Sequence, residues 1–193
     1  MKKITIVVLV MLLVASIGQV ASAKGSVGAF AGYNITGKGF SVAVNGEYEF
    51  VNWFSLAGEA EVVIAKDEPS GKIGVAYLFD LEGKFTFLNI GKVNLGAKIF
   101  ATSVVESGYT PVLVVGPGIC VNATFLEKLK VELEYGFSLL AVNFATGKVE
   151  FFPLPYFADL GISYALSDNI SLGIKGKLRV GILDLGLAFE YSF

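Results

Sequence analysis

A strict alternation of large apolar residues with small or charged ones, from Leu183 to Phe193, constrains the fold more than any other feature of the chain. Side chains of a β-strand point alternately to its two faces. The large residues of this stretch therefore share one face, which carries Leu183, Leu185, Leu187, Phe189, Tyr191 and Phe193. A tilted strand needs about 9–11 residues to cross the hydrocarbon layer of a bilayer. The stretch therefore predicts a membrane-spanning β-strand.

The same alternation recurs from Lys24 onward, and it predicts ten strands. They cover about 26–36, 40–50, 54–64, 73–87, 93–101, 112–125, 131–139, 156–166, 170–180 and 183–193. No apolar run after residue 23 approaches the length of a membrane-spanning helix. A closed sheet pairs every backbone group in lipid without leaving an edge. We therefore predict an all-β fold for residues 24–193, a single antiparallel up-and-down transmembrane barrel. If two of the segments form one bent crossing, the barrel has eight strands.

Several segments depart from the simple alternation. Gly116-Pro117-Gly118 predicts a bulge or bend, because proline cannot donate a ladder hydrogen bond. Phe100 is a large apolar residue on the inward face of its strand. Residues 145–155, ATGKVEFFPLP, break the pattern and predict the longest loop, with Phe151, Phe152 and Tyr156 packing at the membrane interface. Shorter loops are expected at 66–72 and 106–110, with a tight connection near Gly181.

The first 23 residues have the composition of a secretory signal. Lys2 and Lys3 precede an apolar run, and Ala21-Ser22-Ala23 forms a small-residue cleavage site. We therefore expect residues 1–23 to be removed. Without those two lysines, 13 of the 15 basic residues remain against 17 acidic residues, which gives no sign of nucleic-acid binding. The lone Cys120 can form no intrachain disulfide, and we expect it to be a small inward-facing residue.

In its signal sequence and its last strand, the chain resembles the bacterial outer-membrane β-barrels. The final strand of that family alternates in the same way and ends in an aromatic residue. The resemblance implies a porin-like multi-pass barrel in the outer membrane of a Gram-negative-type envelope. It also implies that outer-membrane lipids surround the protein, and that the export translocon and the barrel-assembly machinery are its partners during biogenesis. By the same resemblance, Phe189, Tyr191 and Phe193 carry the assembly signal. We expect a monomer.

The 193 residues contain no histidine. Histidine is the usual general base near neutral pH, and the known enzymes among small outer-membrane barrels resemble one another in using one. A pair of inward carboxylates remains possible as a catalytic dyad, but inward charge is normal in such barrels. We therefore expect no enzymatic activity and no catalytic, cofactor or metal site.

Charged residues are predicted to line the lumen. Three bases of one strand, Lys175, Lys177 and Arg179, face inward, and acids on the early strands face them, with Lys84 nearby. Unpaired charges in a narrow interior are costly, so we hypothesise an ion-pair network across the lumen that blocks or narrows any channel. The predicted network comprises Glu47, Glu49, Glu59, Glu61, Asp80, Glu82, Lys98, Asp159, Lys175, Lys177, Arg179, Asp184 and Glu190.

The function stays open among a few classes. A closed structural barrel and a narrow diffusion channel share this sequence pattern, and conductance distinguishes them. A soluble lipocalin-like carrier of a small apolar ligand also alternates, but it places apolar residues inside and charge outside. An adhesive role for the loops is the least favoured, because the loops are short.

Overall fold

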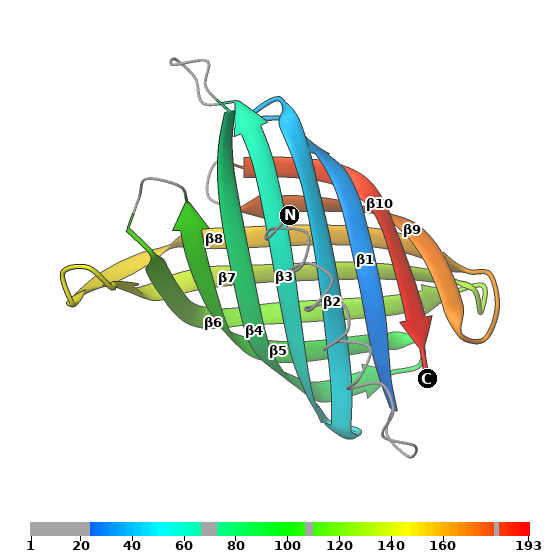
Figure 1. Ribbon diagram of the computed structural model, residues 1–193. Helices are drawn as coiled ribbons and strands as arrows, with labels where there is room; N and C mark the ends of the chain where they lie inside the picture. The colour runs from blue at the N-terminus through cyan, green and yellow to red at the C-terminus, as the bar shows by residue number, and fades with distance from the viewer. Residues whose placement is uncertain (1–23, 67–72, 107–109, 180–181) are drawn as a thin grey trace.

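Ten antiparallel strands form a closed barrel in the computed structural model, which describes residues 24–66, 73–106, 110–179 and 182–193 (Figure 1). Each strand pairs with its neighbours in the chain, and β1 pairs with β10 to close the ring. The strands are β1 (Lys24–Asn34), β2 (Gly39–Val51), β3 (Phe54–Lys66), β4 (Ile73–Ile90), β5 (Val93–Glu106), β6 (Val112–Phe125), β7 (Leu129–Asn143), β8 (Lys148–Ala165), β9 (Ile170–Arg179) and β10 (Ile182–Ser192).

The all-β barrel and its ten strands are therefore confirmed, and the eight-stranded alternative is wrong. No helix among the described residues is long and apolar enough to cross a membrane. The predicted signal at 1–23, most of the loops at 66–72 and 106–110, and the connection near Gly181 lie outside the described residues.

The barrel buries its charged face and exposes its apolar face. On β10, Leu185 and Leu187 are 51% and 60% exposed, whereas Asp184 on the same strand is 2% exposed. The same alternation places large apolar side chains outside on every strand. Two rims bound this wall. We call the one that carries the start of β1, the end of β10 and the turn at Asn52-Trp53 the terminal rim, and the opposite one the far rim.

The predicted loop at 145–155 is wrong. β7 continues to Asn143 and β8 already begins at Lys148, so only a four-residue turn separates them. In that turn Gly147 adopts a φ of 63°, which favours glycine. The resulting β7–β8 hairpin projects beyond the far rim (Figure 1). Strand β8 tolerates its prolines because its pairing with β9 begins only at Phe157, so the earlier residues have one free edge.

Two irregularities interrupt the ladders of β6 and β8, and the second places an additional side chain inside the lumen. The first is a register shift between Val115 and Gly118 on β6, as the Gly-Pro-Gly sequence predicts. The second lies on β8, where Gly136 pairs with Phe157 and the next residue of β7 pairs with Pro155. Tyr156 is left without a partner in the ladder, and both it and Phe157 are buried. The prediction that Tyr156 packs at the membrane interface is therefore wrong, because a bulge changes which face a side chain occupies.

The bulge at Tyr156 completes an aromatic plug, which we define as Phe100, Val114, Tyr156 and Phe157, all buried. The ring of Phe100 stacks on that of Tyr156 with centroids 5.5 Å apart, and it meets Phe157 edge to face at 5.0 Å. Val114 lies near the start of β6, so the plug occupies the far-rim half of the lumen. The anomalous inward Phe100 is thus the centre of an apolar cluster.

Gly136 leaves the space that the plug occupies. A Cβ atom at this position would overlap the Phe157 ring and lie 2.9 Å from Cε1 of Phe100. We predict that Gly136→Ala lowers the free energy of unfolding by about 1–3 kcal/mol, the usual cost of overpacking. Urea unfolding of the protein in detergent micelles measures this change. The matched control is Gly58→Ala, whose Cβ meets no atom closer than 3.6 Å. Equal stability of the two variants would contradict the packing described.

Candidate functional site: the charged lumen

Two adjoining cavities occupy the lumen on the terminal-rim side. The inner one, the chamber, has a volume of about 90 Å³, and the outer one, the vestibule, has about 350 Å³. Both are lined by Glu47, Lys84, Glu134 and Glu190, so they adjoin one another. The vestibule reaches Gly25 and Phe193, where the backbones of the two chain segments pair at the terminal rim.

A first group of ion pairs joins opposite walls of the barrel. From β9, Arg179 Nη2 lies 2.9 Å from Glu59 Oε1 on β3, and Nη1 lies 2.5 Å from Asp80 Oδ2 on β4. In the closed ring of ten strands, β9 and β4 are five places apart and therefore face each other directly. The Asp80 carboxylate also accepts a hydrogen bond from the hydroxyl of Thr102. These contacts connect the two walls across the lumen.

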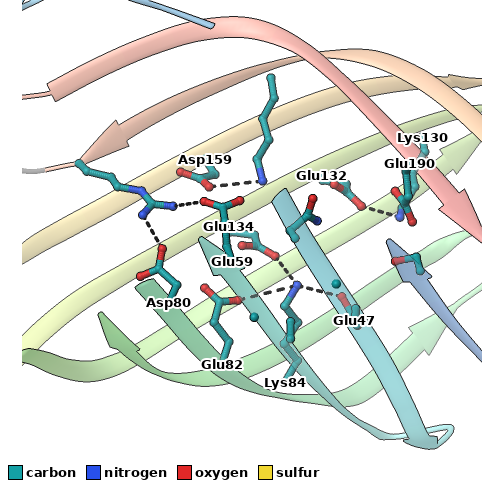
Figure 2. Close-up of a pocket in the computed structure, with 17 residues that line it drawn as sticks. Glu47, Glu59, Asp80, Glu82, Lys84, Lys130, Glu132, Glu134, Asp159 and Glu190 are labelled. Carbon is teal, nitrogen blue, oxygen red and sulfur yellow. Dashed lines mark hydrogen bonds and ion pairs between the residues drawn. The ribbon is translucent and has the colours of Figure 1, made fainter. Parts of the chain in front are cut away.

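A second group lies around Lys84, which Figure 2 shows among three carboxylates. Its Nζ is 3.1 Å from Glu47 on β2 and 3.0 Å from Glu134 on β7, and it is 3.8 Å from Glu82 on its own strand. The hydroxyl of Ser55 donates a hydrogen bond of 2.6 Å to the same Glu47. Strands β2, β4 and β7 are therefore connected through one ammonium group.

The two most buried lysines sit in matching cages. Lys98 Nζ lies 2.9 Å from Glu82 and 2.6 Å from Glu134, and 4.2 Å from the centre of the Phe157 ring. The second cage has the same composition, with Lys177 as its cation. Its Nζ is 2.6 Å from Glu59, 3.4 Å from Glu61 and 4.6 Å from the centre of the Phe30 ring. Each ammonium thus has two carboxylates and one aromatic face, which is how a fully buried cation is stabilised.

Two further pairs complete the network. Lys175 lies 3.4 Å from Asp159 on the adjacent strand β8, and Lys130 lies 2.5 Å from Glu132 two residues along β7. Of the predicted network, ion pairs among the described residues include Glu47, Glu59, Glu61, Asp80, Glu82, Lys98, Asp159, Lys175, Lys177 and Arg179.

Three predicted residues face the lumen without joining an ion pair of this kind. Glu49 lines the vestibule, and Glu190 lines both cavities. Asp184 is 2% exposed opposite Asn34 in the β1–β10 ladder, and its Oδ1 has no hydrogen-bond partner. The unpartnered oxygens also include Oδ1 of Asp159, a residue that is 5% exposed.

The sequence-based set omitted four members of the network: Lys84, Lys130, Glu132 and Glu134. The alternation along β4 and β7 already places all four on the inward face. These four residues can therefore be found from the sequence by including every charged residue on the face of each strand that also carries small residues. Strand β7 contributes three of these charges, and one of them, Glu134, pairs with Lys84 and Lys98 on strands that are distant in the sequence.

The arrangement is suited to holding the barrel together, because its ion pairs join strands on different walls. Cys120 is buried beside the vestibule. Within the described ranges, no group of three or more His, Cys, Asp and Glu residues is arranged to hold a metal ion.

Removing one cage cation tests the energetic role of the network. Lys177→Met leaves Glu59 and Glu61 without their closest cation inside the barrel. We predict a loss of about 3–5 kcal/mol in the free energy of unfolding, the usual cost of breaking a buried ion pair from one side. Adding Glu61→Gln should recover part of that loss, because it removes one of the uncompensated charges. Urea unfolding measures both effects, with the exposed Lys128→Met as the control. A Lys177→Met protein as stable as this control would show that the cage does not stabilise the fold.

The comparisons with known proteins identify the fold but no family and no function. No protein-family model matches the chain, and no curated protein matches it. Among solved structures, it is similar to the outer membrane protease OmpT from Escherichia coli, at 9% identity and a TM-score of 0.56, with 89% of this chain and 93% of that one covered. The KdgM porin has 11% identity and a TM-score of 0.49, with 87% and 99% covered. At such identities the likeness shows that the chain has the fold of outer-membrane β-barrels.

Proposed function

We propose that this chain is an integral outer-membrane β-barrel protein with a closed lumen, a structural component of the envelope. The observation that supports this most directly is the polarity of the wall. Large apolar side chains face outward on every strand, and the charged side chains of the network lie inside. An apolar outer surface of this extent is stable in hydrocarbon and unfavourable in water.

The interior argues against the soluble carrier. A lipocalin-like protein needs an apolar cavity for its ligand and a charged exterior. Here the chamber is lined by Glu59, Asp80, Glu82 and other charged groups, and the interior apolar residues pack against each other in the aromatic plug. The described lumen therefore offers charge where an apolar ligand would need hydrophobic contacts.

The interior also favours a closed barrel over a narrow channel. From the terminal rim, the vestibule leads to the small chamber, and the cross-lumen contacts of Lys177 and Arg179 lie next to it. The aromatic plug lies in the far-rim half, next to Arg179. A solute would have to separate both the ion pairs and the aromatic rings, so the protein is proposed to be a barrier rather than a pore.

The remaining parts of the proposal concern activity and partners. The chain carries no histidine, and we propose that it has no enzymatic activity and needs no cofactor. Its proposed partners are outer-membrane lipids, together with the export translocon and the barrel-assembly machinery during biogenesis. We propose a monomer, because the barrel closes on itself through the pairing of β1 with β10.

Membrane fractionation tests the location. Expressed with its first 23 residues, the protein should sediment with outer membranes and resist extraction by carbonate. In detergent it should give a β-type circular dichroism spectrum and migrate at a different position on a gel when it is not boiled, because the closed barrel stays folded. A variant with Leu185→Asp and Leu187→Asp is the control. It places charge on the lipid-facing side and should assemble poorly. Wild-type protein that stays soluble without detergent would contradict the proposal and favour the carrier.

A further inference from the structure

A groove interrupts the apolar outer wall of the barrel over β1 to β4, which lie side by side (Figure 1). Its volume is about 380 Å³, within the range of about 300–1,000 Å³ that is typical of ligand pockets. Most of its lining residues are apolar or glycine. The three acids that border it, Glu47, Glu59 and Asp80, direct their carboxylates to bases of the lumen. The groove is therefore an apolar site on the outside of the wall.

Two paired glycines form the floor of this groove. Gly46 on β2 pairs with Gly58 on β3, and both lie on the outward face because the residues that follow them, Glu47 and Glu59, face the lumen. A Cβ atom added at Gly58 would meet no atom closer than 3.6 Å. The outer wall therefore carries no side chain at this rung of β2 and β3, and the space above the backbone is open.

Larger side chains bound the floor. The rung nearer the terminal rim pairs Tyr48 with Leu56, and the rung on the other side pairs Val44 with Ala60. Leu81 of β4 lies beside the glycines. Four residues separate Tyr48 from Val44, so at about 3.3 Å per residue the groove spans about 13 Å along the strands. An elongated apolar hollow of this length fits a linear hydrocarbon chain.

One end of the groove lies in a cluster of aromatic side chains at the terminal rim. The ring of Tyr48 meets that of Phe50 edge to face with centroids 4.6 Å apart, and Phe50 stacks on Phe54 at 5.8 Å. Trp53 contacts Phe54 and is 60% exposed. In membrane barrels such aromatic belts lie at the level of the lipid headgroups. The groove thus begins at headgroup level and runs toward the middle of the wall, which is the course of an acyl chain.

The surroundings of the groove indicate what fills it. Its edges continue the lipid-facing wall without a change in polarity, since Leu56 and Leu81 are 39% and 55% exposed. Water is absent from the hydrocarbon region, and an empty groove would leave its lining atoms without dispersion contacts. A flexible acyl chain from the surrounding lipid can supply those contacts.

We propose that the groove is a binding site for one acyl chain of a phospholipid, with the headgroup at the aromatic cluster of the terminal rim. The bound lipid is held on the wall by contacts along the groove and exchanges more slowly than the lipid around it. This proposal rests on the membrane location proposed above. It adds a defined lipid site to a wall that otherwise only meets the bilayer as a solvent.

Native mass spectrometry of the purified barrel tests the proposal. The detergent has a rigid steroid body, so that no linear chain competes for the groove, and dioleoyl phosphatidylethanolamine is titrated as the probe. One lipid should bind per barrel in a saturable way. Gly58→Leu places a side chain in the groove and should weaken binding roughly 10-fold, the effect of excluding about two methylene groups from contact. Ala60→Leu fills the inner end of the same groove and should also weaken binding.

Gly176→Leu is the matched control. Gly176 lies on the outward face of β9, between the exposed Ile174 and Leu178, and a Cβ atom there would meet no atom closer than 3.9 Å. The same substitution on the same face, away from the groove, should leave lipid binding unchanged.

Gel mobility before and after boiling shows which variants are folded, and Ala60→Leu keeps the test decisive if Gly58→Leu does not fold. A folded wild-type barrel that retains no lipid would overturn the proposal, and so would a lipid-free dimer, which would mean that a second copy covers the groove. Equal binding by the two groove variants and Gly176→Leu would overturn it as well. A failure of the membrane location is distinguishable, because that protein would be soluble without detergent.

Discussion

The pairing of buried charges inside the barrel is the interaction on which the rest of the structure depends. Each charged group removed from water carries a large desolvation cost, and the cost is offset only when its partners are close and well oriented. Arg179 meets this condition by reaching Glu59 and Asp80 on the opposite wall, and Lys84 by reaching carboxylates on three strands. Backbone pairing connects each strand only to its neighbours around the ring. The network therefore fixes the distance between opposite walls of the barrel.

The outer surface and the aromatic plug complete this arrangement. Alternation along each strand sends large apolar residues outward, so the charges that share a strand with them must face the lumen. The plug lies in the far-rim half of the lumen beside Arg179, which pairs with Phe157 in the β8–β9 ladder. Lys98 links the plug to the network because its ammonium group contacts both Glu134 and the Phe157 ring. We thus propose that the rigidity of the barrel, the closure of its lumen and its location in the membrane follow from the same distribution of side chains.

Period-two alternation was enough to predict the barrel and its ten strands, because the pattern is regular wherever one face meets the outside and the other the lumen. It failed at Lys148–Pro155, where β8 runs on with two prolines. There the edge of β8 that would face β9 has no partner, so the prolines remove no hydrogen bond from a β8–β9 ladder. It also misplaced Tyr156, because a bulge moves one residue to the other face without a change in composition. The charged lining followed from the alternation, but which acid meets which base depends on barrel closure, and sequence spacing does not encode that.

Conductance across a planar bilayer measures the central claim, that the ion-pair network and the plug together close the lumen. The orientation and the number of inserted barrels are determined first. The account then predicts that the wild-type barrel shows no steady open channel. A barrel in which Lys175, Lys177 and Arg179 are all changed to Gln should show raised conductance or unfold at lower temperature, because the cross-lumen contacts are gone. Steady open channels in the wild type, or a substituted barrel indistinguishable from it in both conductance and stability, would contradict the account.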